Sequence, residues 1–108
     1  MNPKRVPVLA TTTTSTREDA GKIAAALVEQ RLAACVQIVD PITSVYRWQG
    51  TVENEAEVLL LIKSTQDLIP RISELLDRLH PYDVPELIAT PIAGGSAAYL
   101  SWLEENVR

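Results

Sequence analysis

The side chains best suited to chemistry lie in residues 80–86, which read His-Pro-Tyr-Asp-Val-Pro-Glu and hold the only histidine of the chain. Two prolines restrict the backbone of this segment, so we expect His80, Tyr82 and Glu86 to hold fixed positions. An imidazole at such a place binds a metal ion or a polar ligand. It is expected equally often as a structural group that stabilises the carboxyl end of a helix, and the residues leave both roles open.

Two further reactive side chains, Cys35 and Lys63, lie near the ends of predicted strands. A single cysteine forms no disulfide within the chain and most often is a buried, inert thiol. One cysteine and one histidine do not close a zinc site, so a metal site would need carboxylates or several subunits. Lys63 lies either at the surface with its stem packed or in a cleft between subunits.

The sequence does not predict a catalytic site. A nucleophilic triad would have to use His80 as its only base, and nothing marks its partners. The threonine run 11–14 and the segment 94–96 each precede a predicted helix, where an anion can bind. Neither has the lysine or the glycine spacing of a phosphate loop. We therefore predict that the protein is not an enzyme.

Composition predicts one acidic domain over residues 1–108, with residues 1–5 as a flexible N-terminus. Of the 108 residues, 46% are hydrophobic, and ten Lys/Arg stand against fourteen Asp/Glu. No basic surface is available to neutralise phosphates, so we expect no nucleic-acid partner. The N-terminal segment is too short and polar for a signal peptide, and no apolar stretch is long enough to span a bilayer. These features predict a cytoplasmic protein with no membrane partner.

Hydrophobic periodicity predicts the elements that position these side chains. Strands are expected over 6–14, 34–48, 51–63 and 87–92, and helices over 16–31, from 64 or 65 to 79, and after 96. The order βαββαβ is that of a ferredoxin-like α+β sandwich, here with an extra C-terminal helix. Ser15 and Glu18 have the spacing of a capping box, and Pro41 predicts a bulge or a bend in the second strand.

The third predicted strand divides into two halves. Its first half carries Glu53, Asn54, Glu55 and Glu57, which we expect to be solvated. Its second half, residues 58–62, is a continuous apolar run that predicts a strand covered on both faces. In the C-terminal helix, Tyr99, Leu100 and Leu103 are expected to face inward.

The second and third strands form a hairpin that is too long for the domain. A strand over 34–48 runs about 50 Å, whereas a compact domain of this length has a radius of gyration of about 13 Å. The overhanging tip would leave Tyr46 and Trp48 in water on a monomer. Either the aromatic groups pair across the hairpin, or the hairpin pairs with a neighbouring copy. We favour self-association into a small cyclic oligomer, with Tyr46 and Trp48 at the interface.

Several segments together carry a family resemblance. In order and spacing they resemble the divalent-cation tolerance protein CutA family from Val8 to about Val107. The segments are 27–36, 44–50, 57–65, 80–86 and 99–103. The resemblance implies a ferredoxin-like subunit, a homotrimer formed through edge strands, a cytoplasmic location and a link to copper and divalent-cation tolerance. The implied trimer is similar to that of the PII signalling proteins, which bind small molecules in clefts between subunits.

The chain departs from the family at its proposed copper ligands. Family members for which copper ligation is proposed have a cysteine at the position of Ala10 and two consecutive histidines at the positions of Leu79 and His80. Only His80 carries over as a metal candidate, because alanine and leucine do not ligate copper. The first hypothesis is therefore a trimeric protein that responds to or binds divalent metal ions such as copper.

The alternative hypothesis is a PII-like sensor or scaffold that binds a small molecule or a partner protein in a cleft between subunits. Its candidate cleft residues are Lys63, Tyr82, Glu86 and Cys35.

Overall fold

The structure, a computed structural model, describes residues 5–108. Residues 1–4, most of the predicted flexible N-terminus, lie outside the described residues. The elements follow the predicted order: β1 (Pro7–Thr14), α1 (Arg17–Glu29), β2 (Cys35–Trp48), β3 (Thr51–Thr65), α2 (Ile69–Leu79), β4 (Ile88–Pro91) and α3 (Ala97–Glu105). A 3-10 turn, η1 (Gln66–Leu68), leads into α2.

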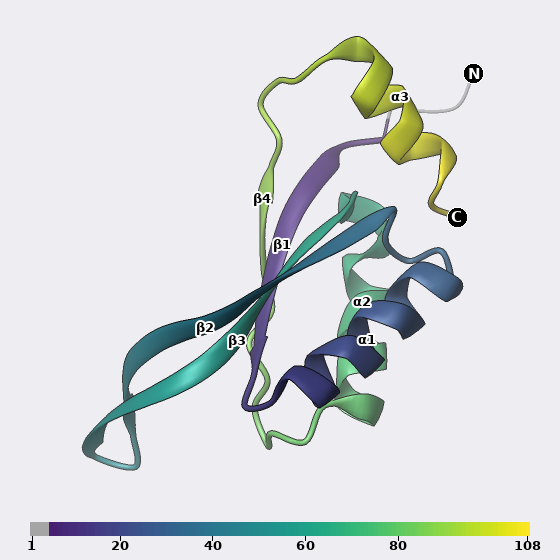
Figure 1. Cartoon of the computed structure of the whole chain (residues 1–108). Helices are drawn as coiled ribbons and strands as arrows, with labels where there is room; N and C mark the ends of the chain where they lie inside the picture. The colour runs from purple at the N-terminus through teal and green to yellow at the C-terminus, as the bar shows by residue number, and fades with distance from the viewer. Residues whose placement is uncertain (1–4) are drawn as a thin grey trace.

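The four strands form one antiparallel sheet in the order β2-β3-β1-β4. Helices α1 and α2 cover one face of the sheet (Figure 1). This arrangement confirms the ferredoxin-like α+β prediction. The core lies between the helices and the sheet, and its fully buried members include Ile23, Leu27, Leu60, Ile62, Ile72 and Leu75.

Only one face of β3 is fully covered within the chain. Val58, Leu60 and Ile62 point toward the helices and are buried, whereas Leu59 and Leu61 alternate to the other face and are half-buried. The predicted cover on both faces is therefore wrong for the single chain. The helices reach one side of the sheet, and α3 contacts only part of β1 and β3.

The hairpin of β2 and β3 extends well beyond the helices (Figure 1), as predicted. The molecule measures 50 × 25 × 22 Å, and its radius of gyration is 14.6 Å. Pairing continues to Trp48 and Thr51, and Gln49 and Gly50 form the turn with φ angles of 49° and 82°. Two left-handed residues are what the tightest hairpin turn requires. The register shifts between Val39 and Ile42, which places the predicted bulge at Pro41.

The helix starts differ in part from the prediction. Thr16, not Ser15, caps α1, because its hydroxyl accepts from the backbone N–H of Asp19 at 3.1 Å. Thr65 precedes η1 and makes no side-chain capping hydrogen bond. Ser96 caps α3, because its hydroxyl accepts from the backbone N–H of Tyr99 at 3.2 Å.

In α3, one of the three residues predicted to face inward is buried. Leu103 is fully buried, but Tyr99 is 40% exposed. The helix lies at one end of the sheet, so a single side of it meets the core (Figure 1). Among residues 5–108, no helix is both long and apolar enough to cross a membrane.

Candidate functional site

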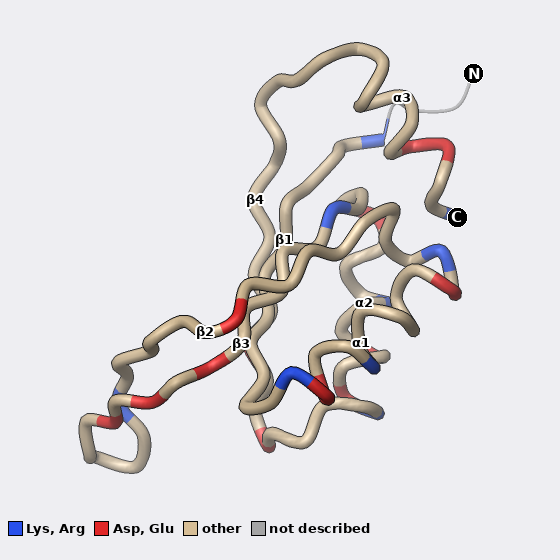
Figure 2. Tube along the Cα trace, viewed as in Figure 1, with Lys and Arg blue, Asp and Glu red and all other residues tan. Residues whose placement is uncertain are grey.

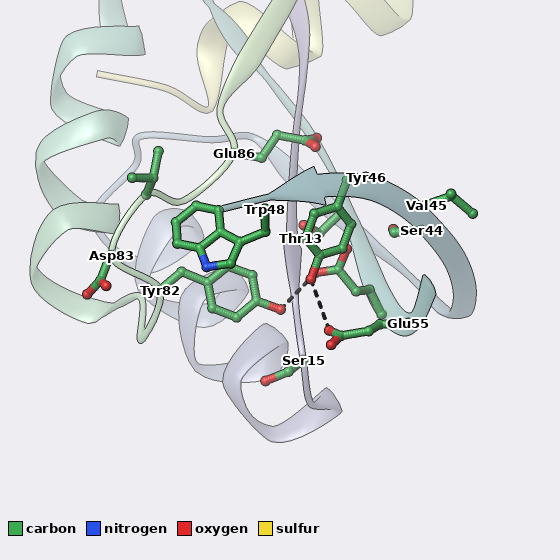
Figure 3. Close-up of a pocket in the computed structure, with 12 residues that line it drawn as sticks. Thr13, Ser15, Ser44, Val45, Tyr46, Trp48, Glu55, Tyr82, Asp83 and Glu86 are labelled. Atoms are coloured by element: carbon green, nitrogen blue, oxygen red, sulfur yellow. Dashed lines mark hydrogen bonds between the residues drawn. The ribbon is translucent and has the colours of Figure 1, made fainter. Parts of the chain in front are cut away.

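A cavity of about 590 Å³ lies between the hairpin and the segment that joins α2 to β4 (Figure 3). Three aromatic side chains line it, together with four carboxylates, three hydroxyl side chains and two valines. They are Tyr46, Trp48, Tyr82, Glu55, Glu57, Asp83, Glu86, Thr13, Ser15, Ser44, Val45 and Val84. The two sides of the cavity come from parts of the chain that are far apart in sequence.

His80 holds one side of the cavity in place. Helix α2 ends at this residue because Pro81 follows, and His80 is extended with φ −81° and ψ 132°. Its side chain turns inward and is only 7% exposed. The ring Nε2 lies 2.7 Å from the carbonyl oxygen of Thr13, and Nδ1 accepts from the backbone N–H of Tyr82 at 3.1 Å. These bonds assign the neutral tautomer with the proton on Nε2 and tie the segment to β1.

The same bonds bear on the predicted metal role of His80. Both ring nitrogens already have partners, so a metal ion would have to displace one of the two bonds. Within residues 5–108, no group of three or more His, Cys, Asp or Glu side chains is placed to hold a metal ion. Ala10, at the family's cysteine position, is fully buried in the core. A metal role for His80 stays a prediction.

Tyr82 and Glu57 form the innermost contact of the cavity. The Tyr82 hydroxyl donates to Oε2 of Glu57 at 2.7 Å, and its ring centroid lies 4.6 Å from that of His80. Burial of the hydroxyl, followed by its bond to the Glu57 carboxylate, raises the pKa of Tyr82 above its usual range. Removing the phenolic proton would place two negative charges side by side.

Glu57 was not predicted as a site residue, and its predicted solvation is wrong. It is 7% exposed, because the segment after α2 folds over this part of β3 and brings Tyr82 onto it. The only local indication was its place directly before the apolar run 58–62. The covering residue lies 25 positions away, so the strand pattern does not reveal it.

The predicted cleft residues Tyr82 and Glu86 both line the cavity, together with Tyr46 and Trp48, which were predicted at the subunit interface. Glu86 accepts from the Thr11 hydroxyl at 3.0 Å, and the Tyr46 hydroxyl donates to Glu55 at 3.1 Å. Tyr46 and Trp48 remain 38% and 45% exposed, so the cavity is open on the hairpin side.

The other two predicted cleft residues lie elsewhere in the chain. Cys35 and Lys63 are neighbours in the pairing of β2 with β3, and Lys63 Nζ lies 5.4 Å from the centre of the Tyr99 ring. Lys63 is six residues from Glu57 along β3, a separation of about 20 Å. Neither Cys35 nor Lys63 lines the cavity. A cleft between subunits that contains Lys63, Tyr82, Glu86 and Cys35 stays a prediction.

Comparison with known proteins gives consistent matches. The family model of the CutA1 divalent ion tolerance protein matches residues 8–106. The divalent-cation tolerance protein CutA of Thermus thermophilus is 54% identical over 94 residues, covering 87% of this chain and 91% of that protein. The chloroplastic protein CutA of Arabidopsis thaliana is 46% identical over 97% of this chain, which spans 58% of its length. Mouse protein CutA is 45% identical, and the match covers 49% of its length.

Solved structures agree with the fold. The Cut A1 structure from Thermus thermophilus superposes with a TM-score of 0.92 at 50% identity, covering 94% of this chain and 99% of that chain. The Oryza sativa CutA1 structure superposes with a TM-score of 0.92 at 41% identity, covering 95% and 94%. The order of elements, the overhanging hairpin and this similarity along nearly the whole sequence agree. The chain therefore belongs to the CutA1 divalent ion tolerance protein family.

Proposed function

We propose that this protein is a homotrimer without enzymatic activity that binds a small molecule in the cavity between the hairpin and residues 82–86. The observation that carries this proposal is the cavity itself. Its volume of about 590 Å³ falls in the range of small-molecule sites, and its wall combines aromatic surface with a few convergent polar groups. The bonds of His80 to β1 and to Tyr82 support a cavity that exists before a ligand arrives.

The proposed trimer rests on the exposed surfaces of the single chain. Strands β2 and β4 are the edges of the sheet, and Val45, Val52, Val84 and Ile88 near these edges are 59–72% exposed. Edges of this kind pair with another chain unless they are protected. Contact between different edges is head-to-tail and has to close into a ring, which favours a cyclic oligomer. Such contact would also cover Tyr46 and Trp48.

Binding of a divalent metal ion is the second candidate. It is favoured by the name of the Thermus relative, although the cavity carboxylates of the described chain form no group of three or more that is placed to hold a metal ion. Copper is a poor match to this set, because copper prefers imidazole and sulfur ligands over carboxylates. A cytoplasmic location also stays a prediction.

A ligand screen on the native assembly tests the first candidate. We expect one or more organic compounds to raise the melting temperature and to change Trp48 fluorescence in a Trp102→Phe background. The control is Trp48→Phe with Trp102 retained, whose fluorescence should not change, because Trp102 lies on α3, away from the cavity residues. If divalent metal ions alone raise the melting temperature, the second candidate replaces the first. If neither class of ligand does, both candidates are wrong.

A further inference from the structure

Helix α3 follows a segment that few contacts hold in place. The last backbone bond of β4 runs from the N–H of Ile92 to the carbonyl oxygen of Pro7, and residues 93–95 make no backbone hydrogen bond within residues 5–108. These three residues are exposed, and a side chain at Gly94 would meet no atom within 4 Å. Beyond them the helix lies apart from α1 and α2 (Figure 1). The segment is therefore suited to act as a hinge.

Little apolar surface fixes α3 to the rest of the chain. Of its nine residues only Leu103 is buried, and Val107, just beyond its end, is 5% exposed. Helices α1 and α2 each bury three residues. On the side of the sheet, Lys63 Nζ lies 5.4 Å from the centre of the Tyr99 ring. Elements with few buried apolar side chains open at a lower free energy than the core elements do.

The C-terminal end of α3 is fastened to the turn after α1 by reciprocal hydrogen bonds. The Arg31 guanidinium donates to the carbonyl oxygen of Glu105 at 2.7 Å, and the Arg31 carbonyl oxygen accepts from the N–H of Arg108 at 2.9 Å. The Arg108 side chain donates to the carbonyl oxygen of Gln30 at 2.8 Å. Figure 2 shows a basic position at this turn, close to the C-terminal end of the chain. Both side-chain bonds lie at the surface, so water readily replaces them.

Arg31 has a backbone conformation that is unusual for an arginine. Its φ is 58°, and the N–H groups of residues 31 and 32 bond back into the last turn of α1. This way of ending a helix usually places glycine at the left-handed position, because a side chain there costs free energy. Glycine would end α1 equally well, but it would not reach Glu105. That contact is the one hydrogen bond of the Arg31 side chain within residues 5–108.

We propose that α3 is a lid, hinged at residues 93–95 and latched by Arg31, that opens while the rest of the subunit stays folded. In the closed state the Tyr99 ring covers the ammonium group of Lys63. In the open state Lys63 loses this cover, so the lid controls access to this end of the sheet. None of these residues lines the cavity, and the inference therefore does not depend on the proposed function.

Hydrogen exchange of the backbone amides, measured by mass spectrometry on the full chain in its native assembly, tests the lid. We expect the amides of α3 to exchange about tenfold faster than those of α1 and α2. Low concentrations of denaturant should hardly change the rate for α3, because a local opening exposes little surface. If α3 exchanges only as fast as α1 and α2, with the same dependence on denaturant, it opens only when the whole subunit unfolds, and the inference is wrong.

Two glycine variants locate the latch. Arg31→Gly keeps the left-handed backbone and removes the guanidinium, so α3 should exchange about fivefold faster while α1 exchanges no faster than before. Gln49→Gly is the matched control, because Gln49 is the other non-glycine residue of the described chain with a positive φ, 49°, and lies in the hairpin turn. It should leave the exchange of α3 unchanged. Arg108→Ala removes the bond to Gln30 and should also make α3 exchange faster.

Faster exchange of α3 alone, in Arg31→Gly but not in Gln49→Gly, supports the lid. If Arg31→Gly accelerates α1 and α3 equally, the arginine stabilises the whole subunit and is not a latch. If Arg31→Gly accelerates neither helix, other contacts hold α3 and the inference is wrong. Glycine suits the backbone at position 31, so this variant should fold, and its melting temperature checks that it does. Failure of the ligand screen, in contrast, overturns only the proposed function.

Discussion

His80 and Tyr82 act as a pair that anchors the residues after α2. The histidine ring bonds to Thr13 on β1 and to the backbone of Tyr82, and the tyrosine hydroxyl reaches Glu57 on β3. Three elements are thereby linked through two side chains. The effects of changing these residues should therefore extend to both stability and the cavity.

His80→Ala should lower the free energy of unfolding by about 2 kcal/mol, because one buried and one partly buried hydrogen bond are lost. Denaturant unfolding at a fixed chain concentration measures this change, with Leu79→Ala, at an exposed position, as the control.

Copper should bind only at micromolar or poorer affinity, and His80→Ala should largely remove this binding, whereas Cys35→Ser should hardly change it. Nanomolar copper affinity in His80→Ala would contradict this prediction.

Tyr82 should ionise only at strongly alkaline pH. Burial and then the bond to Glu57 raise the pKa of Tyr82, so the folded state favours the protonated phenol. The stabilisation is therefore fully present below the unfolded pKa of about 10 and is lost as the pH rises through the higher folded value. Ultraviolet absorbance of tyrosinate should show a late phase that is absent from Tyr82→Phe. A late phase that persists in that variant would assign it to another tyrosine.

At the scale of elements, the hairpin and the start of α1 set the limits of the site. β1 ends at Thr14 and α1 begins at Arg17, so Ser15 is left in the connection and lines the cavity. The hairpin carries Tyr46 and Trp48 to the opposite wall. Each of these elements contributes residues to the cavity because it ends or turns beside it.

Thr16→Ala should cost about 1 kcal/mol of stability, because the α1 cap bond to the N–H of Asp19 is lost. Thr16→Ser keeps the hydroxyl and should be close to the unsubstituted chain. Chemical denaturation of the three proteins at equal chain concentration gives the comparison. Equal losses for the alanine and serine variants would show that the hydroxyl does not cap the helix.

Trp48→Ala should weaken assembly more than Trp102→Ala. The two indoles are similarly exposed, at 45% and 42%, but Trp48 lies on the overhanging hairpin. Trp102 lies on α3, where its ring is 5.5 Å from that of Tyr99 in the same chain. Sedimentation over a dilution series measures both dissociation constants. Equal constants would count against the hairpin as the main contact.

The whole molecule is elongated, and a single chain leaves part of its hydrophobic surface exposed. Its long axis of 50 Å is at least twice each of the other two, which measure 25 and 22 Å, and exposed hydrophobic residues lie on both the hairpin and the β4 side. A soluble monomer seldom leaves this much apolar surface on two sides. We therefore expect the chain to be one subunit of an oligomer.

Light scattering at micromolar concentration should give three times the chain mass of 11.9 kDa. The physical reason is that, in the proposed closed ring, the overhanging hairpin of one copy and the free edge of β4 of the next would cover each other. Dilution in the same experiment separates a stable trimer from weak association. A stable species of single-chain mass would show that the hairpin stands alone in solution.

Local patterns in the sequence were sufficient to predict the helices and strands and their order. Helical spacing of apolar residues, β-branched runs, the turn at Gln49 and Gly50 and the stop at Pro81 each depend on neighbours along the chain. The length of the hairpin against the size of the domain was likewise enough to predict its overhang. The order of the motifs was enough to predict the family, and the match of the family model over residues 8–106 confirms that prediction.

The composition of the site depended on contacts between distant parts of the chain. His80 meets Thr13 across 67 positions, and Tyr82 meets Glu57 across 25. Apart from its place directly before the apolar run 58–62, no local pattern distinguishes Glu57 from the glutamates before it, because its burial comes from the segment that folds over β3. Cys35 and Lys63 were predicted to share a cleft between subunits with Tyr82 and Glu86, but within the single chain neither of them lines the cavity. Which residues are buried, and which lie close together, depends on how the elements pack against one another. Packing depends on contacts between residues that are far apart in the sequence, so local patterns do not predict it.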